Sequence, residues 1–297
     1  MIQRGEELAG AIAWVAFLSW LWLLIEPLVR RYLEQRRAGV GKFVANFFSQ
    51  SLQQEMLFFA LPLMVGATQR DAGQIIFTAL AAAAALLTTL DPVYERYIAT
   101  RAAFRLLFHA YCSLIVGIVV LPMVVHIPME RALPLSLIAV GAWLLITLPM
   151  SLRSLKTPRQ KAIWIAASLL GPLLLWTLRS HIPAAGLAAT RALVTQSISD
   201  LTPGAPVQTL TSADLNRGVV AFVAIRAPRG VAQSVIFEWR HADEAERIVA
   251  EIHGGNKIGW RTYSRKQAFP KDARGTWIVD VLTPQQQLLK RLRFEVR

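Results

Sequence analysis

The stretch that decides the fold is LLFHAYCSLIVGIVVLPMVVHI, residues 106–127, which has no aspartate, glutamate, lysine or arginine. A helix rises 1.5 Å per residue, so this stretch reaches about 33 Å as a helix, enough to cross a hydrocarbon core of about 30 Å. The sequence therefore predicts an integral membrane protein.

Five further apolar segments are also predicted to be membrane-spanning helices: residues 8–29, about 50–68, 73–90, 133–150 and 162–178. The whole chain of 297 residues is 54% hydrophobic and only 17% charged, with a mean hydropathy of +0.41. Average soluble domains are about 45–50% apolar and about 25% charged. We therefore expect a polytopic α-helical membrane bundle of about six helices over residues 1–178.

The basic residues of the expected loops indicate how these helices are oriented. The loops after the first, third and fifth spans contain twelve lysines and arginines, whereas the N-terminus and the other two loops contain three. Short basic loops stay cytoplasmic. Six spans therefore place both termini outside, which predicts a multi-pass protein of the bacterial inner membrane with its N- and C-termini in the periplasm.

The composition changes after residue 178. Residues 179–204 are mixed and are expected to form a membrane-surface segment and linker. Residues 205–297 alternate apolar and polar side chains with a period of two, as in QSVIFEWRH at residues 233–241. Five such runs and the continuous apolar run 219–225, separated by turn signals, predict a periplasmic antiparallel β-sandwich. The expected fold class is therefore α+β in two parts.

Three motifs occur in order within this second part: GWRTYSRK (259–266), FPKDARGTWIVDV (269–281) and LKRLRFEV (289–296). Together they resemble a family of bacterial C-terminal domains, domain of unknown function 2914, over roughly Val219 to Arg297. Members of that family commonly have membrane helices before this domain, and LDPVYERY at residues 90–97 resembles the corresponding membrane region. The resemblance supports the architecture and implies no particular activity.

The sequence lacks the common catalytic motifs, among them the phosphate-binding G-x-x-x-x-G-K-[ST], the G-x-S-x-G elbow and the zinc-binding H-E-x-x-H. A single cysteine, Cys112, excludes a disulfide framework and multi-cysteine zinc sites. We expect no catalytic residue, no metal and no cofactor. The alternative is a metal site, if His241 and His253 meet across the hairpin 233–253.

Polar side chains within the expected membrane helices form a candidate intramembrane site, because unpaired polar groups are costly in hydrocarbon. The candidates are Gln54, Glu55, Asp91, Arg105 and His109. They would serve a small transporter, or a membrane-embedded enzyme that acts on a lipid. The alternative is structural: Asp91 caps a turn, Arg105 reaches the interface and Glu55 pairs with an arginine.

The solvated face of the expected sandwich is basic. Residues 200–297 contain 15 basic and 10 acidic side chains, a net charge of +5. Such a field in the periplasm suits an envelope protein or an anionic glycan or lipid, and not nucleic acid. The first functional hypothesis is therefore a non-enzymatic protein, anchored in the lipid bilayer, that binds such a partner. No pattern indicates an oligomeric state. The candidate ligand face consists of Arg240, Arg261, Tyr263, Arg265, Arg291 and Arg293.

Overall fold

The computed structural model describes residues 14–15, 17–22, 25, 29, 38–70, 73–125, 127–228, 232–255 and 258–297. The chain divides into two compact units. The helical unit comprises Met1–Val65, Ile76–Ile127 and Arg131–Leu178, and the β unit comprises Gly66–Ile75, Pro128–Glu130 and Arg179–Arg297.

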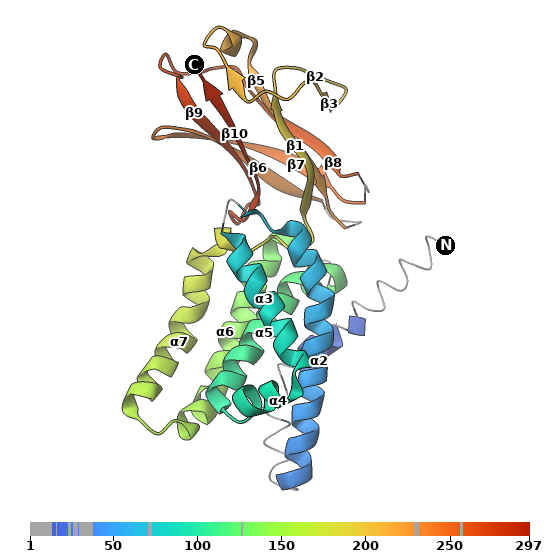
Figure 1. Cartoon of the computed structure of the whole chain (residues 1–297), viewed down its shortest axis with the longest axis vertical. Helices are drawn as coiled ribbons and strands as arrows, with labels where there is room; N and C mark the ends of the chain where they lie inside the picture. The colour runs from blue at the N-terminus through green and yellow to red at the C-terminus, as the bar shows by residue number, and fades with distance from the viewer. Residues whose placement is uncertain are drawn as a thin grey trace, which may run out of the picture. The chain divides into compact units, whose positions relative to one another are not determined.

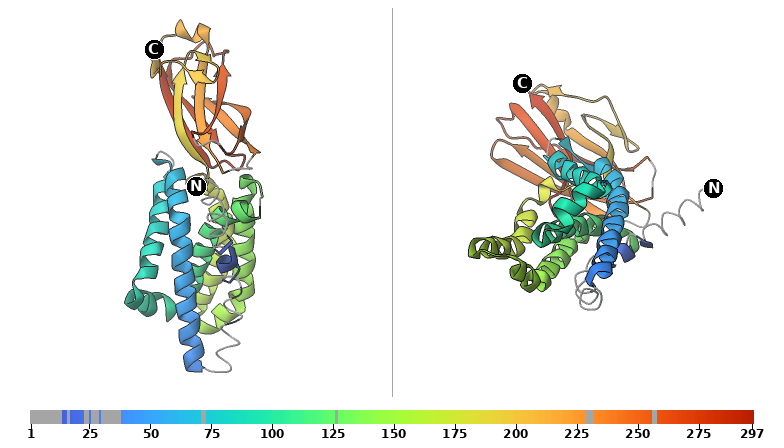
Figure 2. Two further views of the ribbon diagram at one scale, coloured as in Figure 1. Left: turned by 90° about the vertical axis from the view of Figure 1, so that its right-hand side faces the viewer. Right: turned by 60° about the horizontal axis from the view of Figure 1, so that its bottom comes forward.

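Long helices that lie side by side make up the helical unit (Figures 1 and 2). Their bounds are Ala38–Ala67 for α2, Gln74–Thr89 for α3, Ala102–Val124 for α5, Met129–Ser154 for α6 and Pro158–Thr177 for α7. The start of α7 shows how local sequence sets a boundary. Thr157 accepts a hydrogen bond from the Gln160 amide, the Gln160 side chain accepts one from the Thr157 amide, and Pro158 follows the cap.

A sharp break separates α3 from the next helical segment. Leu90 has a non-helical backbone, and the short α4 (Asp91–Val93) then starts with Pro92 in its first turn. It continues as a π-helix, η2 (Tyr94–Ala99). The segment Asp91–Ala99 differs in direction from α3 by 98°. Pro92 has no N–H and its ring would clash with the carbonyl group four residues earlier, so α3 cannot continue through this position, whereas a proline is well tolerated in the first turn of a new helix.

Two of the described helical stretches, Ala103–Val124 and Met129–Arg153, are long and apolar enough to cross a membrane. The bent pair Gln74–Thr89 and Asp91–Ala99 would be a third if it forms one span. The span expected from residues 106–127 is therefore a helix of suitable length and composition. The first expected span, residues 8–29, lies largely outside the described residues.

The β unit contains two larger sheets. The three-stranded sheet has the order β1-β5-β8, formed by Ala188–Thr195, Val219–Arg226 and Trp260–Lys266. The five-stranded sheet has the order β4-β10-β9-β6-β7, formed by Thr209–Leu210, Leu288–Val296, Gly275–Leu282, Ala232–His241 and Glu244–His253. All neighbouring pairs are antiparallel except β4 and β10. A small hairpin pairs β2 (Ile198–Ser199) with β3 (Thr202–Pro203), and the 3₁₀ helices η3 (Arg179–His181) and η4 (Asp214–Arg217) complete the unit.

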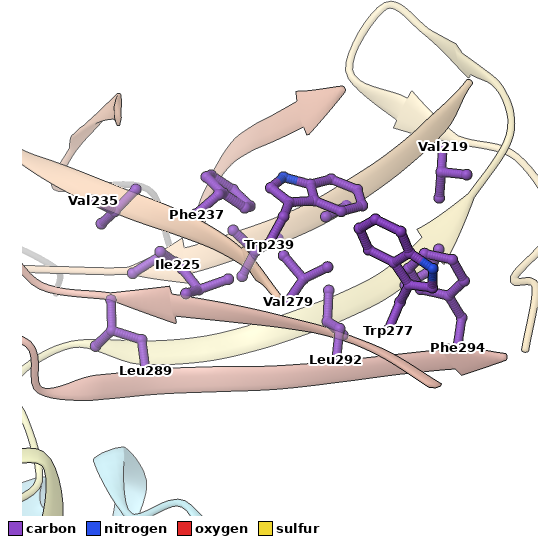
Figure 3. Packing of buried hydrophobic residues seen from close by; sticks show 14 of the residues in the cluster. Val219, Ile225, Val235, Phe237, Trp239, Trp277, Val279, Leu289, Leu292 and Phe294 are labelled. Carbon is purple, nitrogen blue, oxygen red and sulfur yellow. The ribbon is translucent and has the colours of Figure 1, made fainter. Parts of the chain in front are cut away.

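Both larger sheets contribute to one hydrophobic cluster (Figure 3). Alternate residues of β5, from Val219 to Ile225, meet alternate residues of β6, β9 and β10 there. Trp239 and Phe237 of β6 are almost completely buried, and the Trp239 indole donates a hydrogen bond of 2.9 Å to the Ser264 hydroxyl of β8. Strands are thus present at all six runs from which they were expected.

The expectation for residues 179–204 needs correction. Residues 188–195 form β1, which pairs with β5 along its whole length, and β2 and β3 also fall in this range. Most of the expected membrane-surface segment and linker is therefore part of the β unit. The pairing has a bulge between Ala189 and Arg191, which interrupts the alternation that would reveal a strand.

Candidate functional site

The outward face of the three-stranded sheet is a candidate anion-binding surface. Across the three strands, Arg191 of β1 lies beside Ala224 of β5, which lies beside Arg261 of β8. Because side chains alternate along a strand, the residues two positions away point to the same side. These include Arg265 on β8, beside Val220, and Arg226 at the end of β5.

We call this surface the basic face and define it by Arg191, Arg226, Arg261, Tyr263 and Arg265. The four arginines are exposed, and none forms an ion pair within the described part of the chain. Tyr263 is 40% exposed and lies opposite the buried Phe222. The outward positions of these strands contain no carboxylate, so the positive charge of this face is not neutralised locally.

The sequence-based ligand face is divided between two sheets, which corrects the expectation of a single surface. Arg261, Tyr263 and Arg265 belong to the three-stranded sheet, whereas Arg240, Arg291 and Arg293 belong to the five-stranded one. The sequence analysis also missed Arg191 and Arg226. Arg226 directly follows the apolar run of β5, but only the pairing of β1 with β5 and β8 places it with the others.

Two of the remaining arginines are already paired. The Asp280 side chain, 6% exposed, accepts two hydrogen bonds from Arg291, at 2.6 Å from Nε and 2.9 Å from Nη2. It also forms an ion pair with Arg240. Arg293 is exposed and has no ion pair within the described residues. The basic face therefore has more uncompensated charge than the arginines around Asp280.

A buried polar cluster lies in the helical unit, but it differs from the one expected. The Gln53 side chain is fully buried and lies 2.9 Å from Nδ1 of His109, and its oxygen accepts a hydrogen bond of 2.8 Å from the Tyr94 hydroxyl. The His109 ring stacks on Trp143 with 5.3 Å between centroids. Among the expected site residues, only His109 belongs to this cluster.

The other expected intramembrane residues do not meet His109. Glu55 is exposed, because two residues along a helix turn it by about 200° from Gln53. Gln54 and the exposed Asp91 line a separate cavity of about 430 Å³, in which the Gln50 amide donates a hydrogen bond of 2.6 Å to Asp91. Arg105 donates one of 2.9 Å to the Ala99 carbonyl oxygen. The structure thus brings together no carboxylate–histidine pair from this set.

The two histidines of the possible metal site lie at opposite ends of their hairpin. His241 is next to the turn, opposite Glu244, whereas His253 pairs with Ala232 at the far end. His241 stacks on Trp277 at 4.4 Å, and His253 contacts Trp260 at 4.8 Å between centroids. No group of three or more potential metal ligands occurs among the residues that the structure describes. The alternative that these histidines meet is wrong.

Comparison with known families gives two matches. Residues 1–221 match the model of DUF5924, a family of unknown function. Residues 232–296 match the model of DUF2914, a protein of unknown function, which confirms the resemblance inferred from the three motifs. Neither the curated proteins nor the solved structures contain a match to this chain.

Proposed function

The chain belongs to the DUF5924 family of unknown function, and we propose that it is a bacterial inner-membrane protein whose β unit binds an anionic glycan in the periplasm. In this proposal about six helices over residues 1–178 anchor the protein. The part of the β unit from residue 179 onward is a periplasmic sandwich. The two apolar helical stretches Ala103–Val124 and Met129–Arg153 support the membrane location, and the core shared by both sheets supports the sandwich.

The observation that carries the proposal is the uncompensated charge of the basic face. Arginine binds carboxylate and phosphate groups through its planar array of N–H donors. Arg261 and Arg265 flank the exposed Tyr263 along β8, and Arg191 and Arg226 lie on the same face, so acidic groups and a flat apolar surface would be recognised together. An acidic polysaccharide has both kinds of feature, since its rings present apolar C–H faces between anionic groups.

The second candidate function, a transporter or lipid-acting enzyme with a carboxylate–histidine site, has less support. Glu55 and Asp91 are exposed, whereas His109 is buried beside Gln53. A proton relay between these carboxylates and His109 would need contacts that the structure does not contain. We therefore propose binding at the basic face.

The proposal is tested by measuring how full-length protein in lipid nanodiscs binds immobilised polygalacturonate, with neutral dextran as the reference polymer. We expect binding to polygalacturonate that weakens with added salt, because exposed charges are screened. Arg261→Gln with Arg265→Gln should weaken it by about tenfold or more, since two charge-assisted hydrogen bonds are lost. Tyr263→Ala should also weaken it.

Arg293→Gln is the matched control, because it removes an arginine that is also exposed but belongs to the other sheet. Its affinity for polygalacturonate should remain within about twofold of the wild type, as expected for a charge outside the site. Equal binding to dextran, or equal effects of Arg293→Gln and the basic-face variants, would contradict the proposal.

A further inference from the structure

A second site lies on the outward side of the five-stranded sheet. A cavity of about 510 Å³ is lined there by Arg240, Arg247 and Arg291, by Glu238 and Asp280, and by Ser180. All its lining residues belong to the β unit. Its volume is in the range of small-molecule sites.

Strand register explains how these charges come together. Arg247 of β7 pairs with Glu238 of β6, Glu238 pairs with Asp280 of β9, and Asp280 pairs with Arg291 of β10. One row across four strands therefore has a cation at each end and two carboxylates between them. Arg240, two residues beyond Glu238, adds a third cation on the same side.

The charges of this cavity do not cancel. The lining contains three arginines and two carboxylates, so these five side chains have a net charge of +1. Asp280 forms ion pairs with Arg291 and Arg240, and Glu238 forms one with Arg247 at 3.2 Å. The Arg247 side chain is 55% exposed and that of Arg240 is 38% exposed, so both retain N–H donors for a ligand.

One donor in this cluster has no acceptor. Nε of Arg240 is buried and forms no hydrogen bond within the described residues. Because Nε is buried, a ligand in the cavity would reach the terminal N–H groups of Arg240, whose side chain is 38% exposed. An anionic oxygen there would accept from these groups and neutralise the surplus charge.

The sequence positions of two residues that line the cavity indicate which anion is available to it. Gly73, which also lines it, is followed directly by the first residue of α3, and Ser180 comes three residues after the last residue of α7. Two of the lining residues are therefore one and three residues along the chain from the ends of these helices. If α3 and α7 lie in the membrane, as proposed above, phospholipid headgroups are the nearest abundant anions.

We propose that this cavity binds a phosphate group with a single negative charge, in the form of a phospholipid headgroup or a free phosphate. The guanidinium groups of Arg240 and Arg247 donate to its oxygens, and the Arg291–Asp280 pair holds Arg240 in position. The choice of a lipid source depends on the membrane location proposed above, whereas the phosphate site does not.

The test uses full-length protein in a non-ionic detergent, titrated by calorimetry with dihexanoyl phosphatidylglycerol and, separately, with inorganic phosphate. We expect saturable binding of at least one probe. Arg240→Gln should raise its Kd by about tenfold, as for the loss of a charge-assisted hydrogen bond. Asp280 keeps both contacts to Arg291 in this variant, so the buried carboxylate stays paired.

Arg247→Gln is the second variant, because its half-exposed side chain can change without disturbing the buried pair, and it decides the question if Arg240→Gln fails to fold. Arg293→Gln, on the same sheet but outside the lining, is the control and should bind like the wild type. Tighter binding of phosphatidylglycerol supports a lipid source, and equal affinities support a free phosphate group. Failure of both probes, or unchanged affinity in the Arg240 and Arg247 variants, overturns the proposal. Either result is independent of polygalacturonate binding at the basic face.

Discussion

Asp280 shows how much depends on one buried charge in the β unit. Its side chain is 6% exposed and two arginines bind it. Asp280→Ala would leave Arg240 and Arg291 facing each other without a counter-charge. Breaking a buried ion pair on one side typically costs about 3–5 kcal/mol. We expect the free energy of unfolding to fall by about that amount, as measured by denaturant unfolding followed by tryptophan fluorescence.

Glu295→Gln is the control for this prediction. Glu295 forms an exposed ion pair with Arg297 at 3.2 Å, and exposed pairs contribute about 0–1 kcal/mol. A loss for Asp280→Ala no larger than that for Glu295→Gln would show that Asp280 is not a stabilising centre.

In the helical unit, Gln53 is a buried polar residue with two partners, as Asp280 is in the β unit. Its side chain accepts from Tyr94 and contacts His109, so Gln53→Leu removes both interactions at a fully buried position. Leaving buried polar groups with fewer partners costs about 1–3 kcal/mol. We expect a lower Tm in detergent, whereas Gln54→Leu, on the half-buried neighbour, should change it little. Equal Tm values for the two variants would contradict this role.

At the scale of elements, the short helix η4 depends on a carboxylate at its start. Thr211 donates to the Asp214 carboxylate from its hydroxyl at 2.6 Å and from its amide at 2.9 Å. These hydrogen bonds hold the pKa of Asp214 below its usual value. A lowered folded-state pKa means that the stabilisation is present above the unfolded-state pKa, about 3.9, and is lost as the pH falls through the folded-state value.

Asp214→Asn therefore should lower the Tm at pH 7, where the wild-type carboxylate is ionised. The difference between the two proteins should persist down to about pH 4 and shrink below it, since the usual pKa of aspartate is about 3.9. Thermal unfolding followed by circular dichroism at several pH values measures this. A Tm difference that does not depend on pH would rule out the ionised carboxylate as the cause.

Elements were predictable from the sequence where one periodicity dominated. The alternation in QSVIFEWRH matches β6, because Val235, Phe237 and Trp239 all point into the core. β1 was missed, because a bulge interrupts its alternation and its partner β5 lies about 30 residues away. The residues that surround His109 could not be predicted, because they too depend on contacts between separate segments. Gln53, Gln54 and Glu55 are neighbours in sequence, and only helix packing decides which of them meets His109.

For the whole molecule, the position of β1 predicts where the β unit can be cut. A fragment of residues 182–297 retains β1, whereas one of residues 205–297 exposes the edge of β5, which is buried along seven of its eight residues. We expect the longer fragment to be soluble and to unfold cooperatively, and the shorter one to aggregate, because exposed apolar edge strands associate. Cooperative unfolding of both fragments would show that β1 is dispensable.

The proposed topology can be tested on the intact chain with an impermeant maleimide. In a Cys112→Ala background, Ser212→Cys should be labelled in spheroplasts, because residue 212 is exposed and proposed to be periplasmic. Thr157→Cys, exposed at the start of α7, should be labelled only after lysis, since its loop is basic. Labelling of Thr157→Cys in intact spheroplasts would reverse the proposed orientation.

The sequence by itself determined that an apolar helical part precedes a β-rich part, because hydrophobic length and a period of two are local properties of the chain. It also indicated six of the strands, each as an apolar or an alternating run. Only the tertiary structure decided which charges meet. Arg191 joins Arg261 through β5, and Asp280 lies between Arg240 and Arg291. Strand order and register set these neighbours, and both arise from packing between segments far apart in the sequence.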